Sequence, residues 1–160
     1  MMETARSYFV KLFSIESGSS TDRILSGVDT CALEEDNVKL KARFTKEEIW
    51  TALMKMGPTK APGEDGLPAI FYQNCWPIIG ENVSNYCLQQ LNNGMDVSSI
   101  NKTNILLLPK LSNPSNITQF KPISLCNVVY KVIAKTIANQ LKVVIHKCID
   151  PRKVSLSQGD

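Results

Sequence analysis

The sequence predicts an α+β fold that is predominantly helical, with a short β-hairpin and a long C-terminal amphipathic helix. Three observations lead to this class. Apolar residues recur at helical spacing over residues 127–149, four branched apolar residues at 105–108 are bounded by polar and proline signals, and helix-capping signals occur between residues 45 and 94. With 160 residues, 43% of them hydrophobic, the chain is long enough to bury one domain core.

The first part of the chain is expected to form one helix and a linker. Thr4–Ser14 places its apolar side chains with helical rather than alternating spacing, and Ser17–Ser20 interrupts that pattern. From there to Asp36, turn-forming residues predominate. We therefore assign residues 1–43 to an N-terminal helix and linker, residues 44–150 to the main domain, and residues 151–160 to a tail.

The next helix has a complete start signal. Thr45 and Glu48 form a capping box, in which the hydroxyl accepts from an amide and the carboxylate reaches back to the cap. Apolar residues follow on one face, and Gly57-Pro58 ends the helix. We interpret this element as a packing helix whose cap is explained by folding alone.

A rigid loop over Lys60–Gly66 leads into two further helices. Its glycines can take up positive φ, and Asp65 is a candidate N-cap, so the loop could present amides to an anion or simply form a tight turn. A helix from about Pro68 is expected to bury Ile70, Phe71 and Trp76. Another helix follows from Pro77 to Leu91, with Gly94 beyond its end.

The apolar run Ile105–Leu108 predicts a short buried strand, because it is strand-length and too short for a helix. Pro109 and Pro122 are expected to stop regular hydrogen bonding. The hairpin-like connection between these prolines would then present Lys110 and Lys121 to solvent or to a phosphate group.

The most regular predicted element is the helix from Asn127 to about Ile149. Its apolar residues follow i, i+3, i+4 spacing and predict one buried side. On the other side Lys131, Lys135, Asn139, Lys142 and His146 fall within an arc of about 80°. This basic stripe is a candidate nucleic-acid contact, although lysines on the outer face of an amphipathic helix also occur without any ligand.

The charge distribution is uneven along the chain, which is one arrangement that attracts polyanions. The net charge is only +3, but residues 97–149 hold seven lysines and no carboxylate. A solvated lysine surface would show the same pattern.

The five cysteines are widely spaced and odd in number, which is typical of reduced core thiols rather than a metal site or a disulfide framework. No apolar stretch approaches the roughly 20 residues of a membrane span, and an intracellular protein is expected.

Several motifs in order resemble the fingers region of reverse transcriptases from LINE-type (non-LTR) retrotransposons, particularly the plant type. They are KAPGEDG at Lys60–Gly66, LLPK at Leu107–Lys110 and FKPISLCNVVYK at Phe120–Lys131. The similarity covers roughly Phe44 to Lys142. It implies that residues 44–150 are a partial reverse transcriptase fingers domain and that the protein acts in the nucleus.

The resemblance also implies site residues and partners. Lys110 and Lys121 match positions that grip the triphosphate of an incoming dNTP, and the wider partner would be an RNA template or an RNA/DNA primer-template. Lys121 departs from the family, which has arginine there. The family holds Mg²⁺ on downstream carboxylates, an aspartate block and a YxDD turn, which this sequence lacks. We therefore expect no catalytic residue, no metal site and no cofactor in this chain, and no polymerase activity from it alone.

Two other interpretations remain open. The chain could be a non-catalytic helical interaction module or RNA-binding module whose lysines mainly keep it soluble. It could also be a remnant that folds poorly, because a fingers piece without its palm would expose the apolar face of the last helix.

Overall fold

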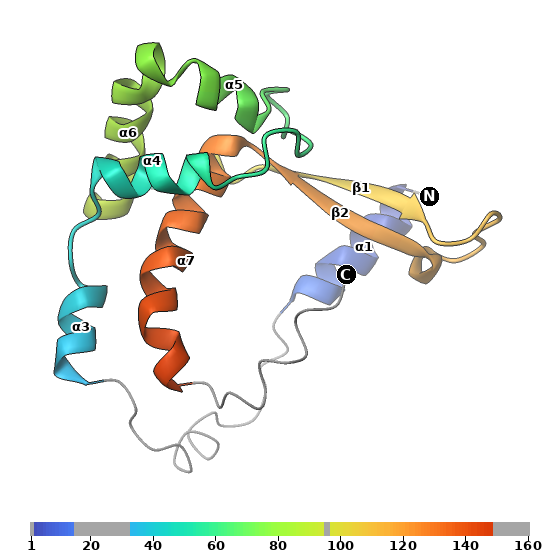
Figure 1. Ribbon diagram of the computed structural model, residues 1–160. Coiled ribbons are helices and arrows are strands. Elements are labelled where there is room, and N and C mark those ends of the chain that lie inside the picture. The colour runs from blue at the N-terminus through green and yellow to red at the C-terminus, as the bar shows by residue number, and fades with distance from the viewer. Residues whose placement is uncertain (1, 15–32, 95–96, 149–160) are drawn as a thin grey trace. The chain divides into compact units, whose positions relative to one another are not determined.

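The computed structural model describes residues 2–14, 33–94 and 97–148. These residues confirm a mostly helical α+β fold with one antiparallel hairpin and a long C-terminal helix (Figure 1). The predicted linker through residue 32 and the tail 151–160 lie outside the described residues. In chain order the elements are α1 (Met2–Phe13), α3 (Glu34–Leu40), α4 (Lys46–Met54), α5 (Ala69–Asn74), α6 (Trp76–Asn93), β1 (Thr103–Pro109), the 3₁₀ turn η1 (Ile117–Gln119), β2 (Phe120–Cys126) and α7 (Val128–Cys148).

The chain forms two compact units. The first comprises Met1–Cys31 and Leu108–Lys121, and it contains α1 and the tip of the hairpin. The second comprises Ala32–Leu107 and Pro122–Asp160, and it contains α3 to α7 with the base of the hairpin.

The core of the second unit lies where α4, α5, α6 and α7 meet. Ile49 and Leu53 of α4 are fully buried there, against Cys87 of α6 and Val132 of α7. Burial raises the pKa of the Cys87 thiol to about 12, so this cysteine is an inert apolar side chain, as predicted.

The start of α4 confirms the predicted capping box. The Thr45 hydroxyl accepts from the Glu48 amide, and the Glu48 carboxylate accepts from the Thr45 amide at 2.9 Å. At the other end of α4, the Gln73 side-chain amide donates to the carbonyl oxygens of Leu53 and Met56. The Gln73 side chain of α5 thus ties α5 to the C-terminal end of α4.

Two details of the loop and of α5 were predicted wrongly. Asp65 does not cap a helix, because α5 begins at Ala69 and the Asp65 carboxylate instead accepts from the Leu67 amide at 3.1 Å in a local turn. Phe71 is 39% exposed, whereas Tyr72 is buried. The helix begins at Ala69, close to the predicted start. Ala69 and Tyr72 rather than Ile70 and Phe71 enter the core, and Trp76 packs against it partly buried.

The helix α6 follows the sequence signals closely. Pro77 lies in its first turn, and Gly94 ends it in the left-handed conformation with φ 62°. Gly80 lies against the indole of Trp76, which leaves no room for a larger side chain.

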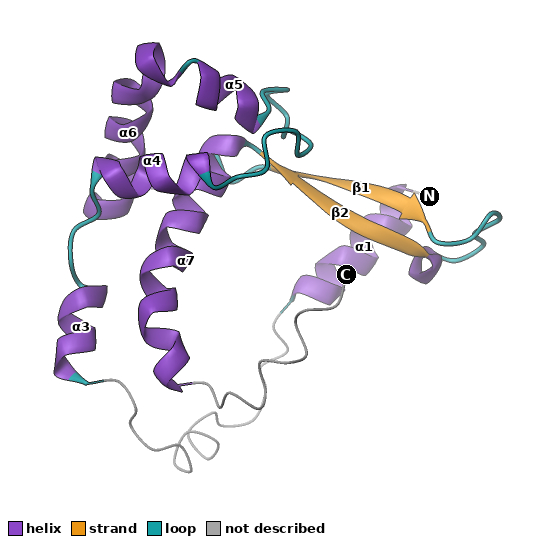
Figure 2. Cartoon of the chain, in the orientation of Figure 1, coloured by secondary structure: helices purple, strands orange, loops and turns teal. Residues whose placement is uncertain are grey.

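The hairpin forms where predicted, but its first strand is not buried (Figure 2). Ile105, Leu106 and Leu108 are each at least 40% exposed, since the described residues form only two strands and a two-stranded sheet covers neither of its own faces. Pro122 also lies inside β2 instead of ending regular structure. Both strands are edges, and an edge strand tolerates proline where its nitrogen faces outward.

The helix α7 contacts α3, α4 and α6. Val128, Val132, Ile133 and Val144 are buried as predicted, but Ile137 is 46% exposed. At its C-terminal end the Lys147 ammonium lies 2.7 Å from the buried Asp36 carboxylate of α3, a helix that the sequence did not indicate. Within the described part of the chain, no helix combines the length and the apolarity that crossing a bilayer requires.

Candidate nucleic-acid interface

Lys110 and Lys121 lie on the same hairpin, with both residues exposed. Lys110 directly follows β1, and its backbone N–H donates to the carbonyl of Gln119 at 2.8 Å, in the 3₁₀ turn that leads into β2. Lys121 is the second residue of β2. The hairpin thus places both predicted phosphate contacts near its turn end.

The turn beside Lys110 is held by its own polar side chains. The Gln119 side-chain oxygen accepts from the amides of Ser115 and Asn116, and the Asn116 side chain accepts from the Thr118 amide. This ordered turn presents the Thr118 carbonyl, to which the Lys110 ammonium donates at 3.0 Å. The Lys110 side chain is therefore oriented rather than free, and two of its three N–H donors remain available.

Two of the three predicted lysines on α7 are tied to the loop that follows α4. The Lys131 ammonium donates to the carbonyl of Ala61 at 3.0 Å, and the Lys135 ammonium donates to the carbonyl of Lys55 at 2.6 Å. Both side chains are half-buried, whereas Lys142 is exposed. The basic stripe is present, but its first two members also fasten α7 to this loop.

The loop is pressed against the start of α7. A Cβ atom on Gly63 would lie 2.1 Å from the Asn127 side-chain oxygen and 2.4 Å from the Asn127 backbone nitrogen, so only glycine fits. The same side-chain oxygen accepts a 3.4 Å bond from the Asp65 amide. The close contact at Gly63, the Asn127 side chain and Lys131 thus hold residues 61–65 against the start of α7.

The ammonium of Lys135 has an unfavourable electrostatic environment. Burial lowers its pKa, and the nearby ammoniums of Lys60 and then Lys55 lower it further. The Lys60 side chain lies over Gly57, with its Cγ and Cε 3.2 Å from the position of a Cβ there. Lys55, Lys60 and Lys135 therefore form a cluster of like charges, which we call the lysine cluster.

Sequence reasoning missed Lys55 and Lys60 as members of this surface. They lie on either side of the Gly57-Pro58 turn, and such a turn reverses the chain, so it brings flanking residues together. That signal could have paired the two lysines with each other. It could not have placed them beside α7, because that requires the packing of α4 against α7.

A comparison with known proteins relates the chain to a transposon protein. No protein-family model matches the sequence. A segment of the transposon TX1 uncharacterized 149 kDa protein of Xenopus laevis is 30% identical to the chain over 151 residues. This chain is related to a transposon protein. The match covers 93% of the chain and 12% of the transposon TX1 protein, so the chain corresponds to a small part of that relative.

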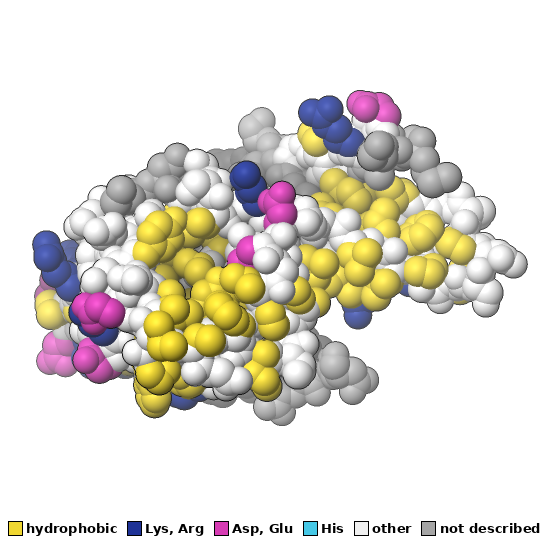
Figure 3. Space-filling model, turned by 90° about the horizontal axis from the view of Figure 1, so that it is seen from above, with side chains coloured by type: hydrophobic (Ala, Val, Ile, Leu, Met, Phe, Trp, Pro, Cys, Tyr) yellow, Lys and Arg dark blue, Asp and Glu magenta, His cyan; other side chains and the backbone are white. Residues whose placement is uncertain are grey.

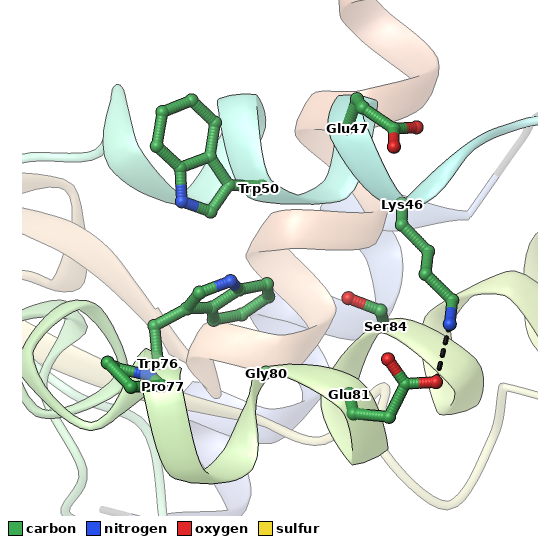
Figure 4. A pocket seen from close by; sticks show the side chains of 8 residues that line it. All are labelled: Lys46, Glu47, Trp50, Trp76, Pro77, Gly80, Glu81 and Ser84. Atoms are coloured by element: carbon green, nitrogen blue, oxygen red, sulfur yellow. Dashed lines mark hydrogen bonds and ion pairs between the residues drawn. The ribbon is translucent and has the colours of Figure 1, made fainter.

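A second concave site lies between α4 and α6, apart from the lysines of α7. Trp50 and Trp76 line one side of this cavity of about 400 Å³, and the ion pair between Lys46 and Glu81 lines the other (Figure 4). The bond from Lys46 holds the pKa of the Glu81 carboxyl below its ordinary value. The negative charge of Glu81 is already neutralised by Lys46. The name of the transposon TX1 relative indicates no ligand for this cavity.

The described residues offer no metal site. They contain no group of three or more His, Cys, Asp or Glu side chains that could hold an ion. A two-metal polymerase centre needs paired carboxylates, and the residues of this interface are cationic, so they do not fit such a centre.

Proposed function

We propose that this chain is a part of an RNA-directed DNA polymerase, the reverse transcriptase of a LINE-type retrotransposon, and that it contributes contacts to phosphate groups. The relation to a transposon protein supports the proposal. The observation that carries it is the placement of Lys110 and Lys121, both exposed, on the two sides of the turn of one hairpin. The proposal assigns no catalytic residue to the chain.

The hairpin suits the triphosphate of a nucleotide. Lys110 is held by the Thr118 carbonyl yet keeps donors for a ligand, and Lys121 is exposed two residues along the opposite strand. Ammonium groups attract phosphate as point charges, without the planar fork of arginine. The hairpin would therefore bind a triphosphate weakly and in a salt-dependent manner.

The second unit suits the backbone of a nucleic acid. Lys131, Lys135 and Lys142 lie within about 40° of one another around α7, at 100° per residue, on the side that meets the loop after α4. We propose that these lysines contact the phosphates of an RNA template or of a primer-template.

Binding assays on the intact 160-residue chain test both contacts. We expect labelled dNTP to bind at low salt, and the double substitution Lys110→Gln with Lys121→Gln to weaken that binding by on the order of tenfold or more, since two charged contacts are removed. Substituting Lys41 and Lys102, which are exposed lysines elsewhere, removes the same charge and should have little effect. Absence of any binding to dNTP and to RNA in low salt would refute the proposal.

A second candidate function is a non-catalytic protein-interaction module. Large apolar side chains on α4 to α6 are exposed, including Ile78 at 82% and Trp50 at 48%. Figure 3 shows hydrophobic side chains gathered on the face of the second unit that is seen from above. Reversing the charges of Lys131, Lys135 and Lys142 separates the two functions, because nucleic-acid binding should be lost, whereas an interaction through the apolar face should persist.

A further inference from the structure

The lysine cluster joins residues from two parts of the chain, the end of α4 with its following loop, and α7. The proposed function uses only the lysine from α7. Lys55 ends α4, Lys60 opens the following loop, and Lys135 comes from the middle of α7. Lys55 and Lys60 are exposed, and both are close enough to Lys135 to lower the pKa of its ammonium. Within the described residues this concentration of positive charge has no counter-ion.

Carboxylates do not neutralise the cluster. The ion pairs of the described residues are Lys46 with Glu81 and Lys147 with Asp36, and neither involves these lysines. Glu64 and Asp65 of the neighbouring loop, both exposed, form no ion pair with these lysines in the described part of the chain. Three ammonium groups gathered without an anion destabilise one another, and a bound phosphate would relieve that repulsion.

The cluster is also fixed in place before any ligand arrives. Lys135 donates to the carbonyl of Lys55, Lys131 donates to the carbonyl of Ala61, and Gly63 is in close contact with Asn127. The loop therefore loses little conformational freedom when a ligand binds, so less of the interaction energy is spent on ordering it. Each of the two α7 ammoniums keeps two further N–H donors.

We infer that Lys55 and Lys60 form, together with Lys131 and Lys135, a contact site for consecutive phosphates of a nucleic-acid strand. This inference rests on the proposed function and adds the two residues that the motifs of the hairpin and of α7 did not supply.

The extent of the surface favours a strand over a single nucleotide. Along α7, Lys131 and Lys142 are separated by eleven residues, a rise of about 16 Å at 1.5 Å per residue. Lys55 and Lys60 widen the surface sideways at Lys135. One triphosphate cannot reach over this length, whereas several nucleotides of a strand can.

The test compares two double variants of the intact chain by titrating a labelled single-stranded RNA at several salt concentrations. Lys55→Gln with Lys60→Gln should weaken binding by on the order of tenfold, and should lower the slope of log K against log salt by about 1.4, since each lost contact to a single strand removes about 0.7. Lys41→Gln with Lys102→Gln removes equal charge from exposed positions outside the cluster, and should leave the slope nearly unchanged.

The outcomes separate this inference from the proposed function. Wild-type protein that binds neither RNA nor dNTP at low salt defeats the proposed function itself. Wild-type binding with an unchanged salt slope in the Lys55/Lys60 variant, or with equal losses in both variants, overturns only the cluster. Addition of free inorganic triphosphate is the third arm, and displacement of the RNA at equal phosphate concentration would show a single-anion site instead of a strand site.

Discussion

The ammonium of Lys135 lies 2.6 Å from the carbonyl oxygen of Lys55, at the C-terminal end of α4. A cation at this position satisfies a carbonyl that the helix leaves unpaired and interacts favourably with the negative end of the helix dipole. The same ammonium is repelled by its neighbours Lys60 and Lys55. Lys135 therefore takes part in one stabilising and one destabilising electrostatic interaction.

Replacing Lys60 by methionine should stabilise the folded chain slightly. Methionine keeps an unbranched apolar chain over Gly57 and removes one charge that repels Lys135. We expect the free energy of unfolding to rise by a few tenths of a kcal/mol, roughly the size of exposed charge interactions at low salt. Chemical denaturation at low and high salt measures the change. A gain that persists in high salt would show that repulsion is not its cause.

Because the pKa of Lys135 is lowered, the stability gained by Lys60→Met should depend on pH. Because the folded state holds this proton less tightly than the unfolded state, its ionisation opposes folding below the folded pKa, and that penalty disappears as pH rises toward the ordinary value of 10.5. The advantage of Lys60→Met should therefore shrink when Lys135 deprotonates at alkaline pH.

Gly63 should be among the least tolerant positions of the chain. A Cβ atom there would lie 2.4 Å from the backbone nitrogen of Asn127, and backbone cannot move aside as a flexible side chain can. We expect Gly63→Ala to destabilise by about 3 kcal/mol, the upper part of the usual range for overpacking. Thermal and urea unfolding measure the loss.

Gly66 supplies the control for that substitution. It has φ 69° but nothing within 4 Å of an added Cβ. Asparagine tolerates the left-handed conformation better than other non-glycine residues, so Gly66→Asn should be nearly neutral. If both variants melt alike, close packing against α7 is not what requires glycine at residue 63.

The pairing of Asp36 with Lys147 should make stability depend on acid pH. The hydrogen bond from Lys147, followed by the bond from the Leu33 amide, lowers the pKa of the Asp36 carboxyl below 3.8. A carboxyl whose pKa is lower in the folded state stabilises the fold above its unfolded pKa, and this contribution is lost as pH falls through the folded value.

Asp36→Asn should accordingly melt at a lower temperature than wild type at pH 7. The difference should begin to diminish as pH falls below about 4, near the unfolded pKa, and should disappear only below the lower folded pKa, where the wild-type carboxyl is protonated in both states. Melting curves between pH 2 and 7 provide the measurement. A constant difference across that range would mean that packing around residue 36 matters and its charge does not.

Elements whose formation depends on neighbouring residues were accessible from the sequence. The capping box of Thr45 and Glu48, the left-handed Gly94 and the apolar face of α7 each depend on residues close in sequence, and each is confirmed. The mostly helical α+β class follows from such signals.

Features that depend on tertiary packing were not accessible. Branched residues at 105–108 indicate a strand, yet whether another layer covers it is decided by residues far away, and Ile105 remains exposed. Periodicity placed Lys131 and Lys135 on one side of α7 but could not reveal the carbonyls of Ala61 and Lys55 that hold their ammoniums. The roles of Lys110, Lys121, Lys131, Lys135 and Lys142 in binding stay predictions.

Gln90 offers a stabilising substitution. Its side-chain oxygen is buried without a hydrogen-bond partner, in a mostly apolar cavity of about 450 Å³ beside Leu91 and Ile133. A buried polar atom left unpaired carries a desolvation penalty of about 1–3 kcal/mol. Gln90→Met, of similar length and shape, should raise the free energy of unfolding by about 1 kcal/mol. Equilibrium denaturation that shows a loss would imply a partner for this oxygen in solution.

Lys121 offers a gain-of-function test of the hairpin. Arginine would keep the positive charge and add a planar fork that bonds two phosphate oxygens at once, which lysine cannot do. The residue is exposed, so the larger head group meets no packing constraint. We expect Lys121→Arg to tighten dNTP binding several-fold, on the scale of one added charge-assisted hydrogen bond. Competition titrations against a labelled nucleotide measure this.

The matched control for Lys121→Arg is Lys41→Arg, an equally conservative change on an exposed lysine of the second unit. It should leave dNTP affinity unchanged, because general charge is the same in both variants. The gain at residue 121 should also disappear when Lys110 is replaced by glutamine, since under the proposed function both side chains would hold one ligand beside the turn of the hairpin. A gain that survives the loss of Lys110 would mean that the two lysines do not act on one triphosphate.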